Sequence, residues 1–115
     1  MTLIIKSGTL ITACESFRAD ILIEGEKITQ IGADLDHPDA EILDAGGMLV
    51  MPGGVDPHTH FDLPMFDTVS SDDHYSGHKA AAFGGTTTVI DFVPQDSPTL
   101  SESVEGWHAK ADPKA

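Results

Sequence analysis

The chain has little of what secreted, membrane-embedded or nucleic-acid-binding proteins need. Its single cysteine, Cys14, has no partner for an intramolecular disulfide, and the absence of asparagine leaves no acceptor for N-glycosylation. Six lysine and arginine residues stand against 19 aspartate and glutamate residues, and the net charge of -13 repels the phosphates of nucleic acids and anionic membranes. No run of 18 apolar residues occurs. We therefore expect a cytoplasmic protein with neither nucleic acid nor a membrane as partner.

The first 52 residues predict a β-rich module. The composition, 40% apolar and 22% charged in 115 residues, is that of a globular chain with a single core. Short stretches rich in β-branched residues are separated by glycine and charged residues, which is typical of strands joined by tight turns. The predicted strands cover residues 3–5, 8–12, 20–24 and 27–31, and two more lie within 42–51.

The pattern changes after residue 52 to strand, helix, strand, helix. We predict strands at 54–60 and 86–92, helices at 71–83 and 99–111, and a loop at 61–70. Ser71, Asp72 and Asp73 resemble an N-cap with first-turn acids, and Gly84-Gly85 a helix stop. Thr99 to Glu102 reads as a capping box.

In the second helix, an apolar stripe predicts core packing. Its members are Leu100, Val104, Trp107 and Ala111.

Two strands linked by a crossover helix predict a parallel sheet. A two-stranded parallel sheet leaves faces and edges uncovered, so we expect the chain to be the start of a larger α/β fold that is truncated at its C-terminal end.

His58 and His60 form the strongest candidate site. Side chains alternate along a strand, so both imidazoles, together with Asp56, are expected on one side and Thr59 on the other. The end of a parallel strand is where α/β barrels place catalytic groups, and two imidazoles suit a zinc ion. We predict that His58 and His60 bind a metal.

The other histidines give weaker signals. His74 and His78 have the spacing of one helix face, but they lack the glutamate of the metalloprotease motif and lie away from the strand ends. We expect them on a solvated or interface face. His37 and His108 carry no signal of their own.

The sequence around His58 resembles the dihydropyrimidinase (hydantoinase) family of the amidohydrolase superfamily. The resemblance rests on Met51 to His60 (MPGGVDPHTH), on Phe61 to Pro64 (FDLP) and on Ala80 to Thr88 (AAAFGGTTT), and it covers essentially the whole chain. In dihydroorotases an arginine that binds a substrate carboxylate follows the histidine motif. This chain has Asp62 at that position, which argues against membership among the dihydroorotases.

The resemblance implies a β-sandwich built partly from residues 1–52, followed from residue 53 by the first two βα units of a (β/α)8 barrel. It implies two zinc ions per active site, with His58 and His60 as ligands of one, in a cytoplasmic homotetramer of pyrimidine degradation. The remaining ligands, a bridging lysine and the catalytic aspartate, would come from beyond residue 115, so no catalytic residue lies in this segment and the chain alone is expected to be inactive.

The resemblance also implies the chemistry of the complete enzyme. A metal-bound hydroxide would open the cyclic amide of a dihydropyrimidine or hydantoin to an N-carbamoyl amino acid. Residues 62–69 resemble the substrate-gate loop of the family, with Leu63, Met65 and Phe66 as candidate contacts, although Met65 and Phe66 could equally pack the loop down.

Two alternatives remain at this point. A non-catalytic scaffold with the dihydropyrimidinase fold is one, although such relatives generally lack the metal histidines that this chain retains. The other is a small free-standing domain that binds one metal ion through His58, His60 and Asp56.

Overall fold

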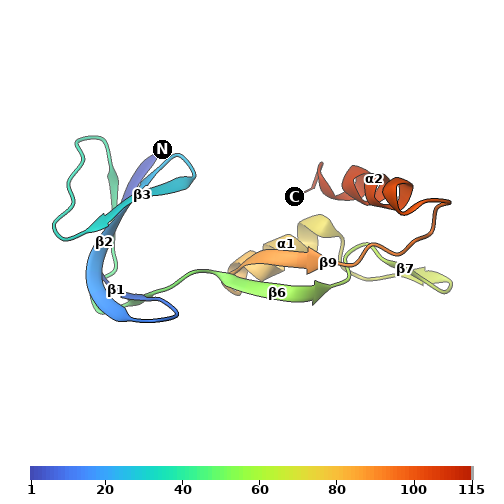
Figure 1. The fold of residues 1–115 in the computed structure, drawn as a ribbon, viewed down its shortest axis with the longest axis horizontal. Helices are drawn as coiled ribbons and strands as arrows, with labels where there is room; N and C mark the ends of the chain where they lie inside the picture. The colour runs from blue at the N-terminus through green and yellow to red at the C-terminus, as the bar shows by residue number, and fades with distance from the viewer. Residues whose placement is uncertain (115) are drawn as a thin grey trace. The chain divides into compact units, whose positions relative to one another are not determined.

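The structure, a computed structural model, describes residues 1–114 (Figure 1). The chain divides into two compact units, one of residues Met1–Pro52 and one that begins at Gly53. The assignment of these units to a sandwich and a barrel stays a prediction. Among the described residues, no helix is long and apolar enough to cross a membrane.

The first unit is one five-stranded sheet. Antiparallel pairing joins the first three strands in the order β3-β2-β1, and β4 and β5 both pair with β1 in parallel. The strands are β1 (Thr2–Ile11), β2 (Ser16–Glu24), β3 (Lys27–Gly32), β4 (Glu41–Asp44) and β5 (Leu49–Val50). The β-rich character that the sequence predicts for this unit is confirmed.

Strand β1 is continuous, whereas the sequence predicts two separate strands. Its pairing with β2 shifts register between Ile5 and Gly8, and Ser7 has a positive φ of 63°. The buried carboxylate of Asp20 accepts hydrogen bonds from the Ser7 N–H at 2.8 Å and the Leu35 N–H at 3.1 Å. This carboxylate stabilises the irregularity, so the strand continues past a position that resembles a turn.

The core of this unit is small. Ile4, Leu22 and Leu35 pack together and are buried. Several apolar side chains of β3 and β4 are instead exposed, namely Ile28, Ile31, Ile42 and Leu43.

The second unit has the predicted strand, helix, strand, helix order. Strands β6 (Gly54–Thr59) and β9 (Thr86–Asp91) pair in parallel and are connected through α1 (His74–Phe83), and α2 (Leu100–Ala111) follows β9. The parallel sheet is therefore confirmed for these two strands, which lie side by side in Figure 1.

The predicted loop at 61–70 contains a hairpin that the sequence analysis missed. Strands β7 (Pro64–Met65) and β8 (Thr68–Val69) pair antiparallel. Its turn includes Phe66 at a φ of 52°. Bulky residues rarely adopt a positive φ, so a phenylalanine at this position does not predict a tight turn.

The start of α1 differs from the prediction. Asp73, not Ser71, is the N-cap: its carboxylate accepts from the Ser76 N–H at 2.9 Å, while the Ser76 hydroxyl accepts from the Asp73 N–H at 3.1 Å. This reciprocal pair stabilises a start at His74, because both orphan donors are satisfied there. The predicted stop at Gly84-Gly85 and the capping box of Thr99 and Glu102 are both confirmed.

The apolar stripe predicted for α2 is only partly buried. Trp107 is 6% exposed, whereas Leu100 is 57% exposed, so core packing is wrong for Leu100 within the described residues. Val104 is 36% exposed and lines a cavity beside Trp107, so it is only partly buried. Ser103 and Trp107 are the buried residues of α2. The indole N–H of Trp107 donates to Asp91, and this bond fixes which side of the helix faces the sheet.

Candidate metal centre

His58 and His60 converge at the carboxyl end of β6. Their Nε2 atoms are 3.0 Å apart, and both side chains are exposed, whereas Thr59 between them is buried. This is the arrangement that strand alternation predicts, although β6 ends at Thr59 and His60 directly follows it. Two nitrogens bound to one tetrahedral zinc at 2.0–2.1 Å are about 3.3 Å apart. The spacing of the pair therefore fits shared coordination of one ion.

Phe92 packs against both imidazoles. Its ring centroid lies 4.8 Å from that of His58, in a stacked arrangement, and 5.1 Å from that of His60. Phe92 directly follows β9, so the ends of the two parallel strands jointly form this cluster. Phe92 falls within the predicted strand at 86–92, but nothing in the sequence predicts its contact with the histidines.

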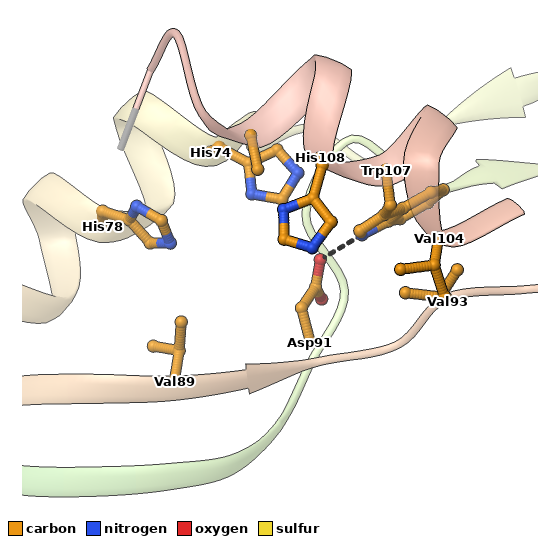
Figure 2. A pocket seen from close by; sticks show the side chains of 9 residues that line it. His74, His78, Val89, Asp91, Val93, Val104, Trp107 and His108 are labelled. Atoms are coloured by element: carbon orange, nitrogen blue, oxygen red, sulfur yellow. Dashed lines mark hydrogen bonds between the residues drawn. The ribbon is translucent and has the colours of Figure 1, made fainter. Parts of the chain in front are cut away.

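Asp91 lies behind the histidine pair and connects three elements. One carboxylate oxygen lies 3.1 Å from the Thr59 hydroxyl and accepts from the Phe61 N–H at 3.2 Å. The other accepts from the Trp107 indole N–H at 2.8 Å (Figure 2). An acid at the end of a strand gives no sequence signal of these contacts, because its partners are 16, 30 and 32 residues away.

No third ligand joins the pair among the residues that the structure describes. The carboxylate of Asp56 accepts from the His58 backbone N–H at 3.1 Å. Among residues 1–114, no group of three or more histidine, cysteine, aspartate or glutamate side chains is arranged to hold a metal ion. The three-ligand site with Asp56 that a free-standing domain would need is therefore not formed by the described residues.

His74 is buried, so a solvated face is wrong for this residue, whereas His78 is partly open to water. The alternative of an interface face stays a prediction. The His74 side chain is 2% exposed, and its Nε2 is buried with no hydrogen-bond partner among residues 1–114. The ring of His74 contacts those of Phe61, His78 and Trp107 at centroid separations of 5.8, 5.7 and 6.4 Å. Aromatic packing against α2 thus buries a residue that its polarity would place outside.

A cavity of about 300 Å³ lies between α1, β9 and α2 (Figure 2). His74 and His78 line it from α1, Val89 and Asp91 from β9, and Trp107 from α2. It is separate from the exposed pair of His58 and His60, neither of which lines it.

The three gate-loop candidates differ in exposure. Leu63 is 8% exposed, and its N–H donates to the Ser70 hydroxyl at 2.9 Å. Met65 and Phe66 project from the β7–β8 hairpin, with Phe66 fully exposed. Phe66 therefore does not pack against the described residues, whereas Met65 is half-exposed, and the role of both in a gate loop stays a prediction.

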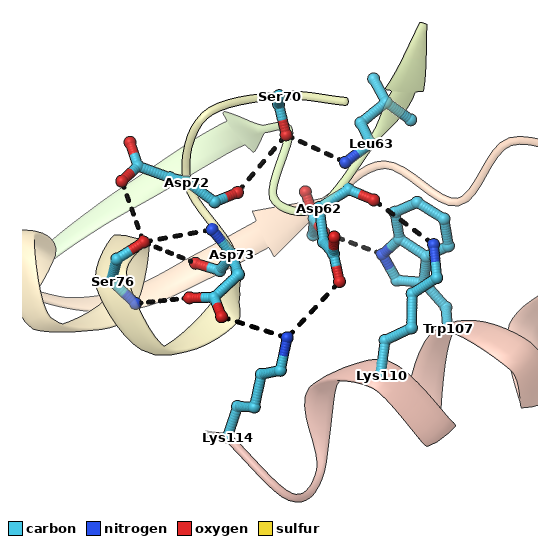
Figure 3. A network of polar contacts seen from close by, with 10 residues as sticks. Asp62, Leu63, Ser70, Asp72, Asp73, Ser76, Trp107, Lys110 and Lys114 are labelled. Carbon is cyan, nitrogen blue, oxygen red and sulfur yellow. Dashed lines mark hydrogen bonds and ion pairs between the residues drawn. The ribbon is translucent and has the colours of Figure 1, made fainter. Parts of the chain in front are cut away.

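A polar network fixes the segment that follows His60 (Figure 3). The Asp62 N–H donates to the Asp72 carbonyl at 2.8 Å, and Lys110 donates to the Asp62 carbonyl at 3.3 Å. Lys114 pairs with the carboxylates of Asp62 at 3.6 Å and Asp73 at 3.1 Å. The Ser76 N–H and then Lys114 lower the pKa of Asp73 to about 2.

Comparison with known proteins shows which family this chain resembles. The chain is 52% identical to D-hydantoinase of Geobacillus stearothermophilus over 116 residues, which cover 100% of this chain. It is 43% identical to dihydropyrimidinase of Rattus norvegicus over 118 residues, which cover 97% of this chain. The chain belongs to the D-hydantoinase and dihydropyrimidinase family. It spans about a quarter of the length of these relatives, 25% and 23% respectively. No family model matches the chain.

Solved structures of the family share the fold. The chain superimposes with a TM-score of 0.94 on the dihydropyrimidinase of Brevibacillus agri NCHU1002, at 48% identity, and with 0.93 on a D-hydantoinase, at 51% identity. Each match covers all of this chain and 25% of the other. Both the β-rich first unit and the βαβα second unit therefore lie within the hydantoinase fold.

Proposed function

We propose that this chain supplies part of the active site of a zinc-dependent cyclic amidohydrolase. The reaction would be ring opening of a 5,6-dihydropyrimidine or a hydantoin to an N-carbamoyl amino acid. The observation that carries the proposal is the convergence of His58 and His60, 3.0 Å apart at Nε2, in a chain whose relatives are named D-hydantoinase and dihydropyrimidinase.

The residues present fit a zinc ion. Neutral imidazole is a common zinc ligand, and the two Nε2 atoms, 3.0 Å apart, lie close to the separation of about 3.3 Å that shared coordination needs. His58 and His60 would hold the ion, and Phe92 would limit how far their rings can rotate. When bound, zinc supplies Lewis-acid activation of water and of the amide carbonyl.

This chain's own residues would bind and orient rather than transfer protons. His58 and His60 provide two nitrogens, whereas catalytic zinc sites have three protein ligands, so further ligands and the proton-transferring carboxylate must come from elsewhere. Met65 and Phe66 offer an exposed apolar surface for the substituent of the substrate ring. Leu63, which is buried, supports the hairpin from below rather than contacting the substrate.

The resemblance to the family supports a proposal for the larger assembly. We propose that β6-α1-β9-α2 begins a (β/α)8 barrel with two zinc ions per site, and that the first unit contributes to a β-sandwich. The complete protein would be a cytoplasmic homotetramer that acts on small cyclic amides.

A chimera tests the proposal directly. This chain would replace the matched quarter of the Geobacillus stearothermophilus D-hydantoinase, and opening of hydantoin and dihydrouracil would be measured with zinc present. We expect activity that falls by at least about a thousandfold in the His58→Ala chimera, because a lost ligand removes the metal chemistry. His37→Ala, a change at a partly exposed loop histidine of the first unit, is the control and should leave the rate unchanged. A His58→Ala chimera as active as its parent would refute the proposal.

A further inference from the structure

We propose that Asp91 is a positioning residue that holds His60, and through it the pair of His58 and His60, at the spacing needed to share a metal ion. The inference rests on the proposed metal role of the pair. It assigns a function to a carboxylate that neither touches the imidazoles nor belongs to the predicted ligand set.

The first observation is that Asp91 contacts the chain on both sides of His60. Its Oδ1 lies 3.1 Å from the Thr59 hydroxyl, which donates either to it or to the Ile90 carbonyl at 3.2 Å. The same oxygen accepts from the Phe61 backbone N–H at 3.2 Å. The Phe92 N–H adds a bond to the Thr59 carbonyl at 3.3 Å. The backbone that carries the His60 side chain is thus fixed before and after that residue.

This fixation matters because the regular strand ladder fails at this point. The pairing of β6 with β9 shifts register between Asp56 and Thr59, and β6 ends one residue before His60. The Phe92 N–H bond to the Thr59 carbonyl holds the residue before His60, but among the described residues His60 itself makes no backbone hydrogen bond. The carboxylate of Asp91 adds the contact on the other side, at Phe61.

The second observation is that α2 holds Asp91 itself. Its Oδ2 accepts from the indole N–H of Trp107 at 2.8 Å. Trp107 is buried, and the ammonium of Lys110 lies 4.4 Å from its ring centroid. The rotamer of Asp91 is therefore set from the side opposite the histidines.

The chemistry of the contacts requires a carboxylate. Donors approach both of its oxygens, Thr59 and Phe61 on one and Trp107 on the other. An amide has a single acceptor oxygen, so it could satisfy one side only and would point its own N–H groups at the donors of the other side. Asp91→Asn should therefore loosen either the His60 backbone or the contact with α2.

The test is calorimetric titration of the 115-residue chain with zinc chloride, with circular dichroism of each variant to verify its fold. We expect Asp91→Asn to weaken zinc binding about tenfold, the lower end of the effect typical of residues that support metal ligands. Asp96→Asn, a matched change at an exposed aspartate of the same unit, should have no effect. Thr59→Val, which removes one of the two contacts flanking His60, should give a smaller loss and serves as the measurement if Asp91→Asn does not fold.

A rescue variant separates positioning from general damage. In Asp91→Asn/Trp107→Phe the indole donor is gone, so the amide oxygen is free to accept from Thr59 and Phe61. We expect zinc affinity to recover most of its loss, whereas a residue important only for stability would give a double variant worse than either single one.

The outcomes distinguish this inference from the proposed function. If His58→Ala binds zinc as well as the parent chain, the proposed metal role itself fails. If His58→Ala weakens binding but folded Asp91→Asn and Thr59→Val bind zinc like the parent, only the role of Asp91 is overturned. Absence of rescue in the double variant also counts against it.

Discussion

The ammonium of Lys114 lies 3.1 Å from the carboxylate of Asp73, the residue that caps the start of α1. The same ammonium is 3.6 Å from the carboxylate of Asp62, two residues after His60. The end of the described chain is thereby connected to the beginning of the helix and to the segment that leaves the candidate metal centre (Figure 3).

This connection predicts a pH dependence with a definite sign. The Ser76 N–H, then Lys114, lower the pKa of Asp73 to about 2, so its contribution to stability is present above about pH 4, the usual aspartate value, and is lost as the pH falls toward 2. Hydrogen bonding to Asp73 raises the pKa of Lys114, so its contribution is present below the usual lysine value and disappears as the pH rises beyond it.

We expect a carbon-13 NMR titration of the Asp73 carboxyl to have its midpoint near pH 2 and to move upward in Lys114→Met. Lys79→Met, which alters an exposed lysine of α1, should not move it. A midpoint at the ordinary value in the parent chain would contradict the role of the cap and its lysine.

Gly77 of α1 leaves room for the ring of Phe61, and this predicts a steric effect. A Cβ at Gly77 would lie 2.2 to 2.8 Å from three atoms of that ring. We expect Gly77→Ala to displace the Phe61 ring and to lower the free energy of unfolding by about 1–3 kcal/mol, as measured by denaturant titration. Because Phe61 directly follows His60, the displacement should also move His60.

Gly106 of α2 provides the matched control. A Cβ there would meet nothing within 4 Å. Gly106→Ala should therefore raise stability by up to about 1 kcal/mol, the gain in helix propensity. Equal effects of the two substitutions would show that Phe61 does not depend on the gap at Gly77.

His74→Phe should stabilise the second unit. The substitution removes a buried Nε2 that has no partner in the described part of the chain and keeps the aromatic contacts with Phe61 and Trp107. It also places the larger ring beside a cavity of about 300 Å³. An unsatisfied buried polar group costs about 1–3 kcal/mol, and we expect a gain of about 1 kcal/mol in a thermal melt. His78→Phe should gain less, because His78 is partly open to water. A loss of stability in His74→Phe would indicate that Nε2 has a partner.

The 115-residue chain alone should not hydrolyse dihydrouracil. It offers two imidazole ligands, and the described residues contain no group of three metal-binding side chains. Product formation in the presence of zinc would be measured against a His58→Ala control, and turnover above that control would contradict the expectation.

The local features of the site were accessible from sequence. Alternation along a strand predicts that His58 and His60 share one side with Thr59 opposed, and the pairing of Thr99 with Glu102 predicts the start of α2. Both depend on residues within a few positions of one another. The structure confirms both.

The features that sequence reasoning missed depend on contacts over long separations. Trp107 bonds to Asp91, and this turns α2 so that Leu100 stays exposed. His74 is buried because Phe61 and Trp107 surround it, although its polarity favours the surface. Neither arrangement leaves a periodic signal along the chain.

Nitrogen-15 NMR of the histidine rings during zinc titration tests the central claim most directly, because it reports each imidazole nitrogen separately. The chain has only six histidines, so their ring signals can be resolved and assigned, and the spectrum shows which of them bind zinc. We predict that Nε2 of His58 and Nε2 of His60 shift together and saturate at one zinc per chain, while His37 and His108 remain unchanged. Zinc-dependent shifts confined to His74 and His78, or no change at His58 and His60, would contradict the claim that this pair is a metal site.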